Sequence, residues 1–296
     1  MMALASRAEQ ESASRRARRS RQATDRLGRA VVYLMLVGTS VCFLIPLFWL
    51  VTSALKSSDE IFVFPQVWIP HPAEWGNFTR ALTTLPFGRF ALNTFVIAGL
   101  TTLGNVFSSA MVAYGFSRFR FPGRRVLFLV MLATLMVPGQ ILLVPQFILF
   151  YKLGWINSFA PLTVPAFFGS AFYIFLIRQF FMGIPAELTD AAYIDGANEW
   201  AIFLRIYVPL SKPALTAVAV FSFQGAWNDF LAPLIYLNSQ KLYTLQLGLS
   251  EFQGIFHTQW NLIMAASTVI MLPMVVIFFL AQRYFIQGIL MSGVQG

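Results

Sequence analysis

The sequence has one cysteine, two histidines and few charged residues. Asp, Glu, Lys and Arg together make up 11% of its 296 residues, against about 25% in an ordinary soluble domain. Cys42 has no second cysteine with which to form an internal disulfide, and no cluster of cysteine and histidine has the spacing of a zinc or iron-sulfur site. These absences exclude a disulfide scaffold, thiol redox chemistry and a structural metal.

Apolar surface dominates the chain instead. Hydrophobic residues make up 57% of it, aromatic residues 16%, and the mean hydropathy is +0.67. A single hydrophobic core in a chain of this length could not bury so much apolar surface, so lipid must cover a large part of that surface. The net charge of +9 does not indicate a nucleic-acid partner, because eight of the 21 basic residues lie before residue 30. Residues 1–29 are therefore expected to form a basic, disordered cytoplasmic tail; an anionic-lipid or nucleic-acid contact is the alternative.

Six apolar stretches are long enough to cross a bilayer as helices, which takes about 20 residues each. Only Asp229 is charged within any of them, and the alternation of barrel strands is missing. The sequence therefore predicts an all-α, polytopic membrane protein whose membrane domain covers residues 30–296. The predicted spans are Ala30 to Leu55, Phe90 to Phe116, Val126 to Tyr151, Phe159 to Ile177, Pro213 to Tyr236 and Leu262 to Gln282.

The basic residues in the connections predict the orientation of the spans. With the N-terminus inside, the inner segments carry sixteen Lys and Arg residues and the outer segments carry five. Lys and Arg favour the cytoplasmic side of short connections. Both termini are therefore expected in the cytoplasm.

The connection between the fourth and fifth spans is long, cytoplasmic and patterned. Within residues 184–210, Pro185 suits the first position of a helix and Gly196 suits its end. Asn198 can cap a second short helix, which is expected to run until Pro209 interrupts it. The sequence predicts a compact helix-turn-helix beneath the membrane.

This helix pair is acidic, and no basic residue occurs between Arg178 and Arg205. Helices that lie on the inner leaflet are normally rich in Lys and Arg, and anionic lipid repels an acidic face. A groove in another protein is the favoured partner, and the leaflet is the alternative. The acidic residues are Glu187, Asp190, Asp195 and Glu199, and the small residues that permit close approach are Ala191, Ala192 and Gly196.

The same segment resembles the signature of binding-protein-dependent ABC transporter permeases. That pattern has Glu-Ala-Ala, three residues, Gly, nine residues, and Ile-x-Leu-Pro. Here Asp190 replaces the Glu and Val208 replaces the Leu, and the spacing matches throughout. Four other stretches resemble the carbohydrate-uptake branch of the maltose and glycerol-3-phosphate type: Phe62 to Pro65, Trp75 to Phe78, Ala113 to Arg118 and Trp227 to Phe230.

The resemblance implies a permease subunit of an ATP-driven importer in a bacterial or archaeal cytoplasmic membrane. It would move a sugar or sugar-like solute, such as an oligosaccharide or a polyol phosphate, by alternating access. The implied partners are a second permease subunit, two ATPase subunits and an extracytoplasmic solute-binding protein. The residues that would couple the chain to the ATPase are Glu187, Asp190, Ala191, Ala192, Asp195, Gly196 and Pro209.

The chain is not expected to be an enzyme or to bind a cofactor. A P-loop requires Lys directly after Gly, and none of the four lysines follows a glycine. ATP and Mg would therefore sit on the partner ATPase.

Asp229 is the one acid predicted at membrane depth, which points to a functional site. One hypothesis places it on the translocation path with Gln224, Asn228 and Gln140. The last of these lies in a span that is expected to be kinked at Pro138 and Pro145. The alternative role is a structural acid satisfied by a helix end. A proton-coupled secondary carrier in which Asp229 titrates is the alternative function, but it leaves the acidic helix pair unexplained. Contact with the binding protein is expected at Gly248, Leu249 and Ser250.

Overall fold

The structure, a computed structural model, describes the backbone of residues 2–254 and 258–292 and the side chains of residues 28–254 and 258–282. Helices dominate these residues, and the one β-type pairing among them is an isolated bridge between Gln253 and Thr258. The prediction of an all-α protein is confirmed. The helices are α1 (Met2–Ala54), α2 (Gly76–Thr84), α3 (Phe87–Arg118), α4 (Arg124–Ala133), η1 (Thr134–Met136), η2 (Gly139–Leu142), α5 (Leu143–Lys152), α6 (Ala160–Thr163), η3 (Val164–Phe168), α7 (Ala171–Met182), α8 (Ala186–Ile194), α9 (Glu199–Ile202), η4 (Phe203–Tyr207), α10 (Val208–Leu210), α11 (Lys212–Trp227), α12 (Leu231–Tyr236), η5 (Gln240–Leu242), α13 (Leu245–Ser250) and α14 (Trp260–Ser292).

Helices long and apolar enough to cross a membrane number four among the described residues, or up to six when each of two bent pairs is one span. The four are Gly28–Ala54, Phe87–Arg118, Ala160–Met182 and Trp260–Gln282. They coincide with the first, second, fourth and sixth predicted spans. The bent pairs contain the third predicted span and the part of the fifth that ends at Trp227.

The third predicted span is sharply bent. Its halves, Arg124–Met136 and Gly139–Lys152, meet at 91°. Pro138 lies in the break in an extended conformation, with φ −61° and ψ 129°. Proline has no N–H and disfavours helix at the residue before it, so the predicted kink is confirmed at Pro138. Pro145 falls in the first turn of α5, where its missing N–H is tolerated, and the helix continues there without the predicted kink.

The fifth predicted span agrees with the structure at its start, where α11 begins at Lys212, and differs at its end. The elements from Glu199 to Leu210 lead into α11 through a bend of 78°. At the other end α11 stops at Trp227 instead of running on to Tyr236. The side chains of Asn228 and Asp229 make local hydrogen bonds to the Gln224 carbonyl and the Ala232 N–H, and such bonds compete with helix.

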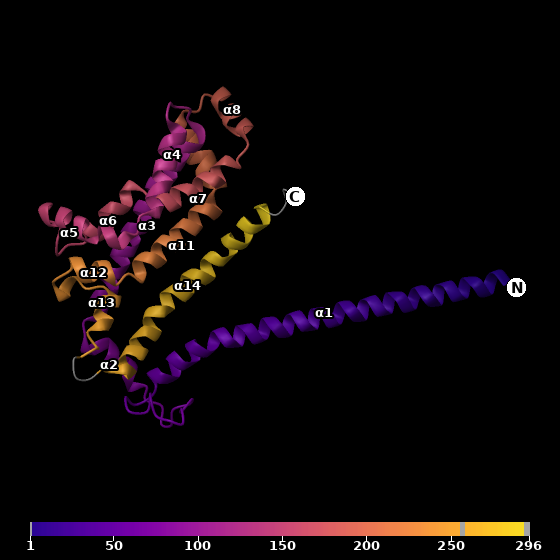
Figure 1. The fold of residues 1–296 in the computed structure, drawn as a ribbon, viewed down its shortest axis with the longest axis horizontal. Helices are drawn as coiled ribbons and strands as arrows, with labels where there is room; N and C mark the ends of the chain where they lie inside the picture. The colour runs from indigo at the N-terminus through magenta and orange to yellow at the C-terminus, as the bar shows by residue number, and fades with distance from the viewer. Residues whose placement is uncertain (1, 255–257, 293–296) are drawn as a thin grey trace.

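Two hydrophobic clusters lie at opposite ends of the helix bundle. In Figure 1, α3, α7 and α11 form the middle of the bundle, α8 lies at one end, and α2 and α13 lie at the other. At the α2 end, the cluster contains Phe90, Trp227 and Phe252. At the α8 end, it contains Tyr114, Phe181 and Tyr207. Because α3 and α11 contribute to both clusters, they connect the two ends.

The first helix leaves the bundle. Figure 1 shows α1 running away from the other helices, with its final turns beside α14. Every side chain from Gly28 to Pro46 is exposed, so this apolar stretch has no partner among the described parts of the chain. The helix also extends back to Met2, which differs from the disordered tail predicted for residues 1–29. Ala, Glu, Gln and Arg, which recur there, are strong helix formers.

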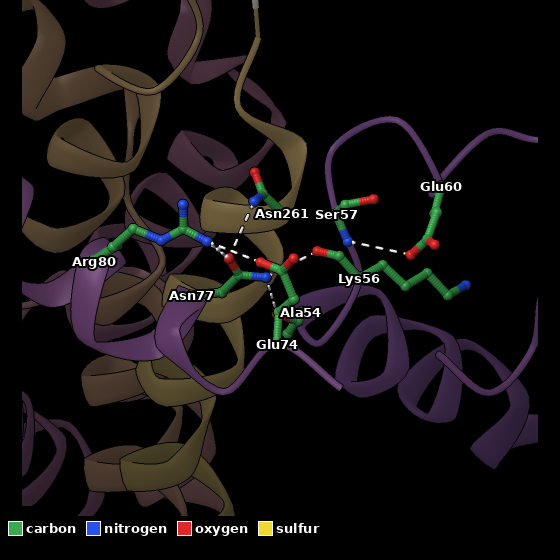
Figure 2. A network of polar contacts seen from close by, with 8 residues as sticks. All are labelled: Ala54, Lys56, Ser57, Glu60, Glu74, Asn77, Arg80 and Asn261. Carbon is green, nitrogen blue, oxygen red and sulfur yellow. Dashed lines mark hydrogen bonds and ion pairs between the residues drawn. The ribbon is translucent and has the colours of Figure 1, made fainter. Parts of the chain in front are cut away.

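A buried asparagine joins three helices at the α2 end (Figure 2). Asn77 is fully buried, and its amide donates to the carbonyls of Ala54 at 2.9 Å and Lys56 at 2.8 Å, where α1 ends. Its side-chain oxygen accepts from Arg80 at 2.6 Å and from Asn261 in α14 at 3.2 Å. Asn77 therefore satisfies carbonyls that the end of α1 leaves open, and it fixes α1 against α2 and α14.

The side chain of Lys56 points away from this junction in Figure 2, and it is also fully buried. Its Nζ lies 4.1 Å from the centre of the Trp49 ring and has no hydrogen-bond partner among the described residues. Burial lowers the pKa of Lys56, while the charge of Glu60 acts in the opposite direction.

Candidate functional site

The helix-turn-helix at the α8 end has the local structure that the sequence predicts. Pro185 directly precedes α8, one position earlier than expected. Gly196 follows the helix with φ +76°, a left-handed conformation that glycine adopts without strain. The Asn198 side chain accepts the Ala201 N–H at 2.8 Å and caps α9. These three features are encoded locally.

The prediction that Pro209 ends the second helix is wrong by one residue. The chain passes from α9 through the π-turn η4 into α10, and helix ends after Leu210. The Val208 N–H bonds to the Phe203 carbonyl, five residues back. Pro209 then falls in the first turn of α10, where its missing N–H is tolerated.

One face of α8 is free and the other packs on the bundle. Thr189 is buried and its hydroxyl lies 2.9 Å from that of Tyr207, while Ala192 packs against the same cluster. The free face carries both acidic and apolar groups, and Ile194 is 88% exposed. The exposed residues of this face and its turn are Glu187, Leu188, Asp190, Ala191, Tyr193, Ile194, Asp195 and Gly196.

Glu199 ties this segment to α3. Its Oε2 accepts a hydrogen bond of 2.6 Å from the buried Tyr114 of α3, and its Oε1 accepts one from Tyr193 of α8. The carboxylate therefore bridges α3 and α8 from the first turn of α9. Hydrogen bonds to a charged acceptor are stronger than those between neutral groups.

Arg118, in the last turn of α3, joins α3 to the last turn of α7 and the segment that follows it. It donates to the Phe181 carbonyl at 3.0 Å and to the Ile184 carbonyl at 2.7 Å, at the end of α7. Its guanidinium lies 4.7 Å from the centre of the Tyr207 ring. A displacement of α8 and α9 would thus reach both α3 and α7. Tyr114 and Arg118 lie in the stretch from Ala113 to Arg118 that resembles the family, but the sequence predicts no role for either, because their partners lie at least 63 residues away.

A cavity of about 720 Å³ lies between α3, α5, α6, η3, α7, α11 and α12, and Asp229 lines it. The Asp229 Oδ1 also accepts the Ala232 N–H at 3.2 Å, in the first turn of α12. Asp229 therefore has the helix-end contact of one hypothesis and the cavity position of the other. Gln146 lines the same cavity.

The other residues predicted to line the path do not gather with Asp229. Gln224 and Asn228 line a separate cavity of about 280 Å³ between α11 and α14. Gln140 is exposed in the bend of the third span and lines neither of these two cavities. The structure brings Asp229 together with Gln146 instead, and the roles of all four residues stay predictions.

The stretch predicted to contact a binding protein lies in α13, at the α2 end. Gly248 is buried, and a Cβ added there would lie 2.2 Å from Phe90. Leu249 and Ser250 are half-buried, and the Ser250 hydroxyl bonds to the Leu247 carbonyl. Gly248 therefore packs α13 onto α3, and contact of this stretch with a binding protein stays a prediction.

Titratable groups do not gather into a metal site in the part of the chain that the structure describes. No three or more His, Cys, Asp and Glu residues lie there in an arrangement that could hold an ion.

Comparison with known proteins identifies the family. Residues 104–291, more than half of the chain, match the family model "Binding-protein-dependent transport system inner membrane component". The chain belongs to this family. It is a permease component, a multi-pass membrane transport subunit rather than an enzyme. The alternative of a proton-coupled secondary carrier finds no support.

Relatives match almost the whole permease. The arabinooligosaccharides transport system permease protein AraQ of Bacillus subtilis (strain 168) is 34% identical over 92% of this chain and 96% of its own. The sn-glycerol-3-phosphate transport system permease protein UgpE of Pectobacterium atrosepticum is 36% identical over 88% of this chain and 95% of its own. A crystal structure of a bacterial ABC transporter involved in alginate import has the same fold, with a TM-score of 0.74 at 24% identity over 88% of this chain and 98% of that one.

Proposed function

We propose that this permease is the membrane subunit of an ATP-driven importer for a sugar or sugar-like solute in a bacterial or archaeal cytoplasmic membrane. The names of its relatives support this class of solute, since they specify arabinooligosaccharides and sn-glycerol-3-phosphate. The proposed partners are a second permease subunit, two ATPase subunits and an extracytoplasmic binding protein. ATP and Mg would be bound by the ATPase.

The observation that carries the proposal is the free face of α8. Leu188 and Ile194 are 44% and 88% exposed beside the acidic Asp190. Such a mixed face fits a protein groove better than water or an anionic leaflet. The groove would belong to an ATPase subunit, and residues 184–210 would be the coupling segment.

The hydrogen bonds of Glu199 and Arg118 beneath this face could transmit a movement of α8 to the membrane-spanning helices. Closure of the ATPase would displace α8, and the Glu199 bridge to Tyr114 would carry that displacement to α3. The Arg118 contacts would carry it to α7. Because α3 and the span Ala160–Met182, which ends with α7, are long enough to cross the membrane, the displacement would alternate access to the solute path.

The same arrangement supports the proposed orientation and partners. The α8 end would face the cytoplasm together with both termini, in agreement with the distribution of basic residues. The α2 end would then face the binding protein. The exposed apolar side chains from Gly28 to Pro46 would contact lipid or the second permease subunit.

The test is a charge reversal at the free face of α8. The chain is reconstituted in liposomes with its candidate ATPase, second permease subunit and loaded binding protein, and the ATPase rate is measured. Asp190→Lys should abolish the stimulation of hydrolysis by the binding protein and weaken co-purification of the ATPase. Asp25→Lys is the matched control, because Asp25 lies in the N-terminal part of α1, outside both residues 184–210 and the α2 end.

The control should retain the ATPase and its stimulation. Full stimulation with Asp190→Lys would refute the proposed docking face. Solute uptake driven by a proton gradient, with no ATPase bound to the wild-type chain, would refute the proposed importer itself.

A further inference from the structure

The cavity beside Asp229 has the size and walls of a small-molecule site. Its volume of about 720 Å³ lies within the range of about 300 to 1,000 Å³ typical of ligand pockets. Its walls come from seven elements between α3 and α12, and they combine large apolar and aromatic surfaces with a few polar groups. The residues with polar side chains that line it include Thr101, Asn105, Gln146, Tyr173, Ser222, Asp229 and Tyr236.

Some polar side chains of the lining are free to bind a ligand. Asn105 donates to the Ser222 hydroxyl at 2.9 Å, and Thr101 donates to the Leu162 carbonyl at 3.0 Å. The Gln146 amide and the hydroxyls of Tyr173 and Tyr236, by contrast, make no hydrogen bond to any other described residue. An amide offers two donors and an acceptor, and a phenol offers one of each. These are the groups that hydroxyl-rich ligands require.

The charge of the lining is one-sided. Asp229 is the one ionisable acid among the lining residues described, and they include no Lys or Arg. Lipid is a poor occupant, because a carboxylate that faces hydrocarbon is costly. An anionic ligand would meet like charge in a low-dielectric setting with no cation to offset it.

The aromatic lining suits one class of ligand. Phe150, Trp155, Phe168 and Tyr236 all border the cavity. Aromatic surfaces bury the apolar C–H faces of a sugar ring, while amides and carboxylates accept its hydroxyl hydrogens. An uncharged sugar satisfies both kinds of wall.

We propose that the cavity lined by Gln146, Tyr173 and Asp229 is a subsite for an uncharged sugar ring, and that Asp229 discriminates against anionic solutes. This rests on the proposed function and narrows it. A permease for phosphorylated or acidic sugars would need a positively charged side chain at such a site, and the described lining of this cavity has none. Asp229 acts as a specificity residue, and its bond to Ala232 fixes its position.

The test compares a neutral and an acidic sugar of equal length on the purified complex. The assembled complex, in detergent and without binding protein, is titrated with maltotriose and with trigalacturonate, and contact is measured by saturation-transfer NMR. Maltotriose should give signals with the wild type, and Gln146→Leu should weaken them. Trigalacturonate should bind at least about tenfold more weakly than maltotriose.

Asp229→Asn is the decisive variant, because the asparagine oxygen can still accept the Ala232 N–H and cap α12. It should reduce the preference for maltotriose over trigalacturonate by about tenfold. Asp59→Asn, which removes a carboxylate from the exposed loop at the α2 end, should leave the preference unchanged.

Any of three results would refute the proposed subsite. The wild type could bind the two sugars equally, Asp229→Asn could keep the wild-type preference for maltotriose over trigalacturonate, or neither sugar could bind. Stimulation of the ATPase by the binding protein is measured on the same preparation. If stimulation persists while the subsite fails, the importer function stands and only the subsite is lost.

Discussion

Removing the hydroxyl of Tyr114 should loosen the coupling segment from α3. The Tyr114 hydroxyl donates to Glu199 at 2.6 Å from a buried ring, whereas Tyr193, which donates to the other oxygen, is 47% exposed. Tyr114→Phe keeps the ring and its contacts in the cluster. It removes one charge-assisted hydrogen bond and little else.

The burial of the two tyrosines sets the size of the effect. A hydrogen bond to a charged group contributes about 1.5–3 kcal/mol, and the buried Tyr114 should lie near the middle of that range, at about 2 kcal/mol. Water competes for Glu199 at the exposed Tyr193, so Tyr193→Phe should cost under about 1 kcal/mol. A loss of about 2 kcal/mol lowers the population of the tied state relative to the loose one about thirtyfold.

Two measurements check this prediction. Denaturant unfolding of the purified protein gives the free energy of unfolding, and reconstituted complexes give the solute transported per ATP hydrolysed. Tyr114→Phe should reduce both more than Tyr193→Phe does. Wild-type values for Tyr114→Phe, or a larger loss for Tyr193→Phe, would refute the bridge through Glu199.

The same bridge predicts a dependence on alkaline pH. Hydrogen bonding to Glu199 is the main cause that raises the pKa of Tyr193 from 10.0 to about 12. A raised pKa means that the stabilisation is fully present below pH 10 and is lost as the pH rises towards about 12. Tyrosinate absorbance should show a component that titrates near this value and disappears in Tyr193→Phe. Its persistence in that variant would contradict the assignment.

Further predictions concern the two ends of the bundle. Asn77→Ala should lower the free energy of unfolding by about 2–4 kcal/mol, because it leaves buried carbonyls of the α1 end without donors, whereas the exposed Thr79→Ala should change it little; equal values would refute the junction. Gly248→Ala should lower the free energy of unfolding by about 1–3 kcal/mol, because the added methyl group overpacks against Phe90. Adding Phe90→Leu to this variant should restore part of that loss. A further, additive loss in the double variant would show that the Phe90 ring does not obstruct the added methyl group. Gly196→Trp, in a left-handed position with open space around it, should leave the chain inserted but uncouple hydrolysis from transport, and a normal transport rate in an assembled complex would contradict this.

The sequence by itself determined the features that depend on short stretches of chain. Hydropathy alone locates the apolar helices, since about 20 apolar residues suffice to cross a bilayer. The bend at Pro138 follows from the missing N–H of proline, the end of α8 from the freedom of Gly196, and the start of α9 from the Asn198 cap. Each of these depends on a residue and its immediate neighbours.

Only the tertiary structure decided which side chains meet. Gln224 and Asp229 are five residues apart, yet they line different cavities because α11 stops at Trp227 and the chain turns before Asp229. Asn77 binds Asn261 across 184 residues, and Tyr114 binds Glu199 across 85. No local pattern marks such pairs, because any polar residue on a helix face can find a partner only once the packing of the helices has brought one within reach.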